Sequence, residues 1–453
     1  MKRRLLSTVA TLLTAVSISA QTTVTDHHAM PQTTYENCNA PRSEFMSYTI
    51  RATATEHNRT NEWNYVEITE YSRTELPNGT TSYTATVDFP EFWGERTIIV
   101  HTEGGRNSHR LYVDDQYVGS ARDSGVPAEF ELPAGLRGRT HTLRLEVPTD
   151  TREPEAGKTA DTPDITSWFL YSQPETRIWD YNISADITGN DGTGLLTADV
   201  IVENNSISTE SFAVCFDVFS PAGNVEEYGM KEVTHPSGGR DTVRIKATIY
   251  GAGKRMWSAE KPNVYTLTLF IGQGKRIREY GPVNGGFGSI SYSDGIISRK
   301  GHKIKLQAIR YEATTAKTRR SDIVSLKKQG YNTLWVHAPQ PYWFYDECDR
   351  RGIYVIDQAN INSPHAADNM RIGGTLSNDP AWLPEYMHRT QAMFYRTHNH
   401  PCIIGWSLGE PSGNGFNLYR TYLWLHNTDP LRPVIYSGAA GNWNSDIDPT
   451  TIL

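Results

Sequence analysis

The chain has 453 residues, with 44 Lys and Arg against 51 Asp and Glu. At roughly 100–200 residues per domain, it has room for two to four domains with sizeable cores. The formal charge of −7 excludes a strongly basic surface, so nucleic acid is not an expected partner. Because no apolar run reaches about 18 residues, no membrane-spanning helix is expected.

The first 20 residues have the pattern of a secretory signal peptide. Lys2, Arg3 and Arg4 form a positive start, residues 5–18 are apolar or small, and Ser19-Ala20 offers a small-residue cleavage site. We therefore expect export to the periplasm or the medium, with residues 1–20 removed.

Residues 35–288 read as β structure. Alternating polar and apolar residues at 141–147 and 243–249, and turn signals such as Pro77-Asn78-Gly79, are typical of short antiparallel strands. We expect a jelly-roll-like β-sandwich over 35–180 and an immunoglobulin-like β-sandwich over 181–288. The charged segment 150–163 is interpreted as a solvated excursion from the first sandwich.

From residue 289 onward the pattern alternates between strand and helix. Strands are expected at 303–310, 333–338, 353–357, 403–408 and 433–437, and helices at 321–330, 341–351, 380–398 and 415–427. Ser321 is the expected N-cap of the first helix, and Gly352 the stop of the second. This alternation predicts a partial (β/α)8 barrel of about five strands over 289–453, where a whole barrel has eight.

The four cysteines, Cys38, Cys215, Cys348 and Cys402, lie far apart in the sequence. Without a short spacing they suggest no zinc site, and three disulfide connectivities stay open. Cys215 and Cys402 sit in apolar runs and are interpreted as small core residues. No cofactor is expected.

Five segments together resemble glycoside hydrolase family 2, the family of β-galactosidases and β-glucuronidases. Each is weak alone, but all five occur in the family's order. They are L-Y-V-D-D-Q-Y-V-G at 111–119, D-S-G-V-P-A-E-F-E-L at 123–132, W-S-A-E-K-P-N-V-Y at 257–265, F-Y-D-E-C-D-R-R-G-I-Y-V-I-D at 344–357, and N-H-P-C-I-I-G-W-S-L-G at 399–409.

The resemblance implies retaining hydrolysis of β-glycosides, which uses two carboxylates about 5–5.5 Å apart. The family places its acid/base in W-S-L-G-N-E-S-G, whereas this chain has Glu410 for the Asn and Pro411 for the Glu. Proline cannot transfer a proton, so Glu410 is the remaining candidate for a relocated acid. The nucleophile belongs to a later strand, and no acidic residue after Glu410 has the right context.

Other active-site positions also depart from the family. The run D-E-A-N-I-E-T-H-G reads D-Q-A-N-I-N-S-P-H at 357–365, so with Asn362 and Pro411 in place of carboxylates no magnesium site is expected. The candidate sugar-binding residues are His337, Asn360, Trp335 and Tyr311, with Trp406 as a further stacking ring.

Three hypotheses stay open at this stage. The chain is a β-galactosidase-like hydrolase with weak or no activity; or it binds a β-linked oligosaccharide or glycoside without catalysis; or it is an inert fragment or a scaffold. A half barrel leaves strand edges uncovered, so a partner chain or a second copy is a further expectation.

Overall fold

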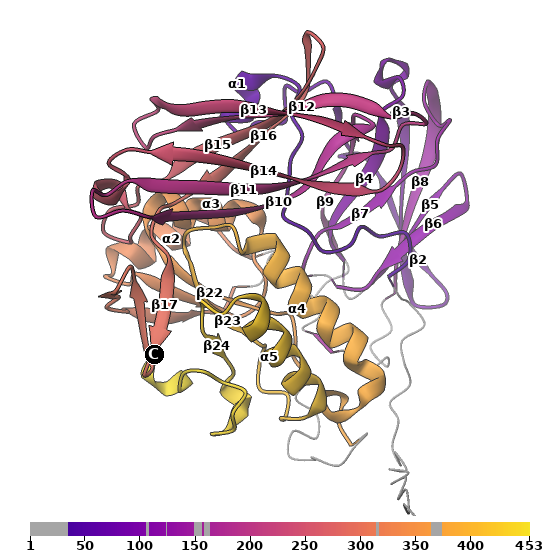
Figure 1. The fold of residues 1–453 in the computed structure, drawn as a ribbon. Helices are drawn as coiled ribbons and strands as arrows, with labels where there is room; N and C mark the ends of the chain where they lie inside the picture. The colour runs from indigo at the N-terminus through magenta and orange to yellow at the C-terminus, as the bar shows by residue number, and fades with distance from the viewer. Residues whose placement is uncertain are drawn as a thin grey trace, which may run out of the picture.

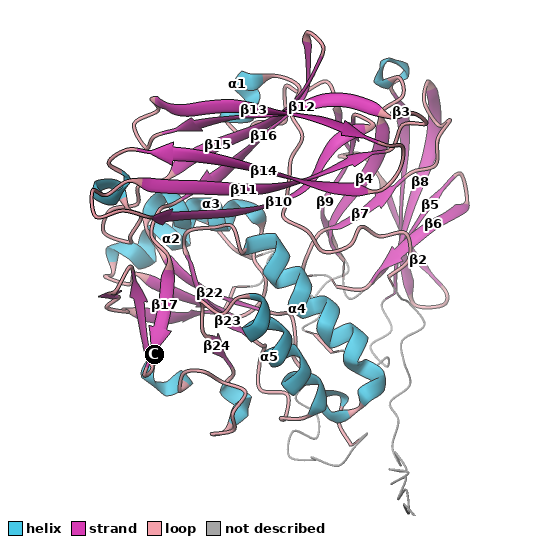
Figure 2. Ribbon diagram, in the orientation of Figure 1, coloured by secondary structure: helices cyan, strands magenta, loops and turns pink. Residues whose placement is uncertain are grey.

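The computed structural model describes residues 35–105, 108–123, 125–148, 156–157, 164–313, 317–363 and 374–453 (Figure 1). Strands make up the first two-thirds, and the long helices gather around the last sheet (Figure 2). In the described part of the chain, no helix is long and apolar enough to cross a membrane. The expected signal peptide lies outside the described residues.

The first sandwich packs a five-stranded sheet on a four-stranded one. The five-stranded sheet has the order β2 (Ser72–Leu76), β3 (Thr80–Phe89), β8 (Arg139–Pro148), β5 (His109–Val113), β6 (Gln116–Ala121). The other has the order β1 (Tyr65–Glu67), β9 (Ile165–Gln173), β4 (Thr97–Gly104), β7 (Ala128–Glu131). Alternation in β8 buries Leu143, Leu145 and Val147 in the core between the sheets.

The second sandwich begins at Thr176, a few residues before the expected boundary. One sheet has the order β10 (Thr176–Ile187), β11 (Gly194–Asn204), β14 (Arg240–Ile249). The other has the order β13 (Val225–His235), β12 (Glu210–Phe219), β15 (Tyr265–Gln273), β16 (Arg276–Gly285). Cys215 is buried in β12, as expected. A small sheet of β17 (Ile290–Ser293), β18 (Ile296–Arg299) and β19 (His302–Lys303) leads to the third unit.

The third unit is a five-stranded parallel sheet, as the sequence predicts. Its order is β20 (Ala308–Tyr311), β21 (Thr333–Val336), β22 (Tyr354–Gln358), β23 (Ile403–Ser407), β24 (Val434–Ile435). The helices between its strands are α2 (Arg320–Lys328), α3 (Tyr342–Arg351), α4 (Leu383–Thr397) and α5 (Phe416–Thr428). Helix α3 ends at Gly352, whose φ of 68° is the left-handed value that glycine allows. The architecture is two β-sandwiches followed by a partial (β/α)8 barrel.

Three local predictions are corrected. Residues 303–310 do not form one strand, because the chain leaves the β19 hairpin before β20 begins. Ser321 is not the N-cap of α2: Arg319 is, and its N–H donates to the Asp322 carboxylate at 3.3 Å. Most of 150–163 lies outside the described residues, but Ala156 is buried in the barrel's apolar cluster rather than solvated.

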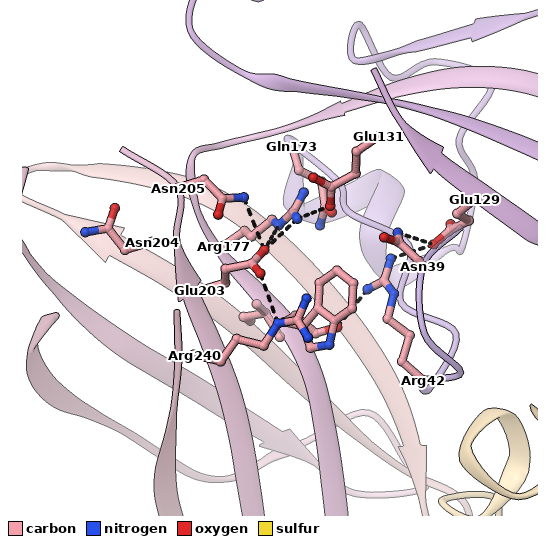
Figure 3. A network of polar contacts seen from close by, with 12 residues as sticks. Asn39, Arg42, Glu129, Glu131, Gln173, Arg177, Glu203, Asn204, Asn205 and Arg240 are labelled. Atoms are coloured by element: carbon pink, nitrogen blue, oxygen red, sulfur yellow. Dashed lines mark hydrogen bonds and ion pairs between the residues drawn. The ribbon is translucent and has the colours of Figure 1, made fainter. Parts of the chain in front are cut away.

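An ionic network centred on the buried Arg177 joins the two sandwiches (Figure 3). Arg177 on β10 lies between Glu131 of the first sandwich and Glu203 of the second, with its Nε 2.8 Å from Glu203 Oε2. Arg240 Nε donates to the other oxygen of Glu203 at 2.9 Å. Trp179, also on β10, has the Arg240 guanidinium 3.5 Å from its ring centroid. These contacts connect the first sandwich to the second.

His101 forms a second buried charge cluster, on the face of β4 opposite the core of the first sandwich. One ring nitrogen lies 3.0 Å from Glu103 Oε1 and the other 3.2 Å from Glu129 Oε1. Burial alone would lower the pKa of His101, but the hydrogen bonds to both carboxylates outweigh it and raise the pKa to about 9. His101 is therefore a cation at neutral pH.

Stability is expected to fall as the pH rises from about 6.5 to 9. The folded-state pKa of His101 lies above its unfolded value, so the stabilisation is complete below about 6.5 and is lost through about 9. Over this pH range the free energy of unfolding is expected to fall by roughly 3 kcal/mol. Denaturant unfolding at pH 6.5 and 9.5 measures it. His101→Gln, which cannot carry the charge, should lose this slope; an unchanged slope would contradict the assignment.

Candidate active site at the barrel mouth

The carboxyl ends of the five parallel strands meet at one edge of the half barrel. In a (β/α)8 fold this edge carries the active site. The side chains come from residues at or just beyond the strand ends: Arg310 is the penultimate residue of β20, His337 follows β21, Gln358 ends β22, Ser407 ends β23 and Ser437 follows β24. The fold thus brings polar side chains from every described strand of the sheet to one place.

Glu410 occupies the centre of this group. Its Oε1 lies 2.7 Å from His337 Nδ1, accepts a hydrogen bond from Gln358 Nε2 at 2.9 Å, and lies 3.8 Å from Arg310 Nη1. The preceding Gly409 has φ 137°, and a Cβ there would lie 2.6 Å from the carbonyl oxygen of Ile361. This close approach allows the Glu410 N–H to donate to that same oxygen at 2.8 Å. The backbone thereby turns the carboxylate toward His337.

The surroundings of Glu410 keep it ionised. Burial raises the pKa of its carboxyl, but the hydrogen bonds and electrostatic interactions with His337, Gln358 and Arg310 outweigh burial. The net pKa lies below the ordinary glutamate value. A general acid at neutral pH needs the opposite shift, because it must carry a proton to donate.

Gln358 and Arg310 organise the mouth, and the sequence analysis did not select either. Gln358 Nε2 also donates to the His337 carbonyl at 2.7 Å, and its Oε1 accepts from Ser407 Oγ at 2.9 Å. Arg310 reaches across the sheet to donate to Ser437 Oγ at 3.0 Å. Two features of the sequence could have selected them. Gln358 stands at a glutamate position of the family motif, and Arg310 stands near the end of the first expected barrel strand.

The predicted stacking rings are not available to a sugar. Trp335 is fully buried, and the Arg310 guanidinium lies 3.6 Å from its ring centroid. Tyr311 is buried against Phe344 and donates its hydroxyl to Asp322 at 2.8 Å. Trp406 is also fully buried. These three rings are therefore not open to a sugar, and the prediction of stacking is corrected. Trp335 lies inside the barrel beneath Arg310, whereas Tyr311 and Trp406 face the covering helices, where Trp406 packs on Phe394 and donates its indole N–H to Asp429.

Asn360 contributes a domain contact rather than an open site. It is buried, and its Nδ2 donates to Asp123 Oδ1 of the first sandwich at 2.6 Å. Nearby, the Asn362 N–H donates to the carbonyl of Ala156 at 2.7 Å. Loops of the first sandwich therefore form one wall of the mouth. His337, with 14% of its side chain exposed, is the predicted sugar-binding residue that both faces Glu410 and keeps solvent access.

The residues present do not fit the family's magnesium ion. Asn362 and Pro411 replace two carboxylates, and Glu410 is already directed at His337 and Gln358. Elsewhere in the described residues, Asp346, Asp349 and His400 lie close enough to hold a metal. Their atoms are used otherwise: His400 Nδ1 lies 2.6 Å from Asp349 Oδ2, and Asp346 accepts from Asn284. This buried cluster ties the second sandwich to the barrel.

Comparisons with known proteins agree with this architecture. The sequence model described as "Glycosyl hydrolases family 2, TIM barrel domain" matches residues 303–451, and "Glycosyl hydrolases family 2" matches residues 176–287. Beta-galactosidase 2 of Enterobacter cloacae is 30% identical in an alignment of 393 positions that covers 81% of this chain and 36% of that protein. A beta-galactosidase of Leuconostoc mesenteroides is 27% identical over 82% of this chain and 37% of its own length.

Solved structures share the fold at low identity. A beta-glucuronidase of Bacteroides uniformis superposes with a TM-score of 0.68 at 15% identity, over 88% of this chain and 52% of that chain. A beta-glycosidase of Bacteroides vulgatus gives 0.66 at 20% identity, over 81% and 47%. The chain spans about a third of the length of the curated relatives it matches.

Proposed function

Because the chain belongs to glycoside hydrolase family 2, we propose that its barrel mouth binds a β-linked glycoside without hydrolysing it by the family's two-carboxylate mechanism. The observation that carries this proposal is the ionisation and pairing of the Glu410 carboxylate. Glu410 is ionised, paired with His337, and followed by a proline where the family has its acid. The mouth keeps hydrogen-bonding groups for sugar hydroxyls but lacks a proton donor at that position.

The ligand we propose first is a β-galactoside. The relatives with the higher sequence identities are named beta-galactosidases, whereas a structure of similar fold is named a beta-glucuronidase. Arg310 gives the mouth a cation that would suit a uronic acid, but Glu410 lies 3.8 Å from it and offsets its charge. Aryl β-galactoside and aryl β-glucuronide are therefore the two ligands to compare.

Binding is expected to weaken about 10- to 100-fold when His337 is replaced by alanine. The change removes a charge-assisted hydrogen-bonding group and frees the Glu410 carboxylate from its partner. Isothermal titration of the purified chain with aryl β-galactoside and aryl β-glucuronide measures the effect. His302→Ala, an exposed histidine on the β19 hairpin, is the control and should bind as wild type. Equal affinity in all three proteins would contradict a site at the mouth.

One geometric observation favours a second candidate, hydrolysis by a relocated pair. Glu312, after β20, has its Oε2 3.3 Å from the same His337 Nδ1 that Glu410 contacts. Two carboxylates thus face one imidazole at the mouth, and a glycosidase mechanism needs a pair of carboxylates. The low pKa of Glu410 argues against its acting as the acid of this pair.

Export and assembly complete the proposal. Export rests on the sequence of residues 1–20 alone, which lie outside the described residues. A partner chain or a second copy along the outer edge of β20 is proposed because that edge strand pairs only with β21 among the described strands. At the other edge, Asp446 exchanges backbone and side-chain hydrogen bonds with Val434 of β24.

A further inference from the structure

A groove of about 700 Å³ lies where the two sandwiches meet, built from elements other than the barrel. The turn η1 (Glu91–Trp93) and the residues before β1 form one side. The β9–β10 connection and the β15–β16 hairpin form the other. Neither the family resemblance nor the proposed site at the mouth involves these residues.

Two exposed aromatic rings stand in this groove. Trp63 is 43% exposed and Phe92 is 68% exposed, although large aromatic side chains normally contribute to cores. Their ring centroids are 6.0 Å apart with an interplanar angle of 63°. The two rings therefore form an open angle rather than a closed stack, and each keeps accessible surface.

Trp63 is held in place by its neighbours. The buried Trp93 donates its indole N–H to the Trp63 carbonyl at 3.1 Å. The Arg96 guanidinium lies 4.9 Å from the Trp63 ring centroid and is itself fixed by donating to Ser172 Oγ at 2.9 Å and to the Ser172 carbonyl at 2.7 Å. A ring positioned before a ligand arrives loses little freedom when it binds.

Acidic, basic and amide side chains line the rest of the groove. Gln273 Nε2 donates to Glu210 Oε2 at 2.7 Å, and Arg278 Nε donates to Gln273 Oε1 at 3.0 Å. Glu175 and Arg276 add another carboxylate and another guanidinium. Such a lining does not select an anion or a cation, but it offers many donors and acceptors to a neutral polar molecule.

We propose that this groove is a second carbohydrate-binding site, which takes a neutral oligosaccharide. A pyranose has an apolar face of C–H groups that packs on an aromatic ring and a rim of hydroxyls that needs carboxylate, amide and guanidinium partners. Trp63 and Phe92 supply the rings, and Glu210, Gln273 and Arg278 supply the partners. Two rings at an angle suit two successive sugar units of one chain. The proposal does not depend on binding at the barrel mouth.

The test separates the two sites by working in the His337→Ala background. Soluble β-galactan and β-glucan, and the corresponding tetrasaccharides, are titrated into this protein by calorimetry and by affinity electrophoresis. Binding of at least one of them is expected, and Trp63→Ala should weaken it tenfold or more. Phe92→Ala should weaken it by a smaller factor, because Phe92 is 68% exposed against 43% for Trp63 and is packed less closely.

The control is Trp443→Ala, which removes another exposed tryptophan, 55% exposed and stacked on Tyr419 of the barrel unit. It should leave the affinity unchanged. Circular dichroism and the unfolding midpoint establish that the Trp63 variant is folded. The proposal is overturned if no saccharide of the panel binds the His337→Ala protein, or if Trp63→Ala binds as tightly as its parent. If His337→Ala weakens glycoside binding but Trp63→Ala has its expected effect on oligosaccharide binding, the result bears on the barrel mouth and not on this groove.

Discussion

Replacing Arg177 by alanine is expected to lower the free energy of unfolding by about 3–5 kcal/mol. The side chain is buried and makes ion pairs with Glu131 and Glu203. Burial raises the pKa of Glu203, but the charge of Arg177 outweighs it and holds the pKa below its usual value. Without Arg177, Glu203 keeps Arg240, whose side chain is 44% exposed, and the Asn205 amide, which donates to Oε2 at 3.2 Å. A carboxylate with a weakened set of partners then remains in a desolvated position.

The matched control is Arg244→Ala in the same sandwich. Arg244 pairs with Asp199 through two hydrogen bonds of 2.6 and 2.7 Å, but its side chain is 61% exposed. Exposed pairs contribute about 0–1 kcal/mol, so this variant should unfold almost as wild type does. Urea unfolding followed by tryptophan fluorescence compares the three proteins. Equal losses for the two variants would show that the interdomain network does not set the stability.

The second large effect concerns catalysis: the purified chain is expected to give no hydrolysis of aryl β-glycosides above the buffer rate. A positioned general acid contributes about 10²–10⁴-fold to such a reaction, and the family position for it is Pro411. The nearest carboxyl, Glu410, is ionised and held by His337 and Gln358, so it has no proton to give to a leaving group. Loss of the acid would lower the rate by this factor, and no acidic residue after Glu410 has the sequence context of the family's nucleophile.

Much of the fold could be predicted from the sequence, because local signals and long-range packing agree there. The alternation of polar and apolar residues predicts β8, and Gly352 predicts the end of α3 because glycine readily adopts the positive φ found there. The N-cap of α2 was missed because a residue with no capping propensity, Arg319, occupies it. Asp322 compensates by accepting the Arg319 N–H while also accepting the Tyr311 hydroxyl from the neighbouring strand. A contact between strand and helix is not visible in a local pattern.

The candidate site was only partly predictable, for a similar reason. The family motif locates Glu410 and His337, but it does not say that Gln358, 52 positions from Glu410, donates to the same carboxylate. That contact depends on the parallel pairing of β22 with β23. The motif also cannot distinguish a ring at the rim from one inside the barrel. Trp335 was therefore predicted as a sugar platform although Arg310 covers it.

The most direct test of the central claim is hydrolysis of aryl β-galactoside, β-glucuronide and β-mannoside by the purified chain beside its Glu410→Gln variant. The account predicts that neither protein releases the aryl group above background, while both are folded and the wild-type chain binds the galactoside. Turnover by the wild type that disappears in the Glu410→Gln variant would contradict it. Such a result would establish Glu410 as a relocated acid and Glu312 as the next carboxylate to replace.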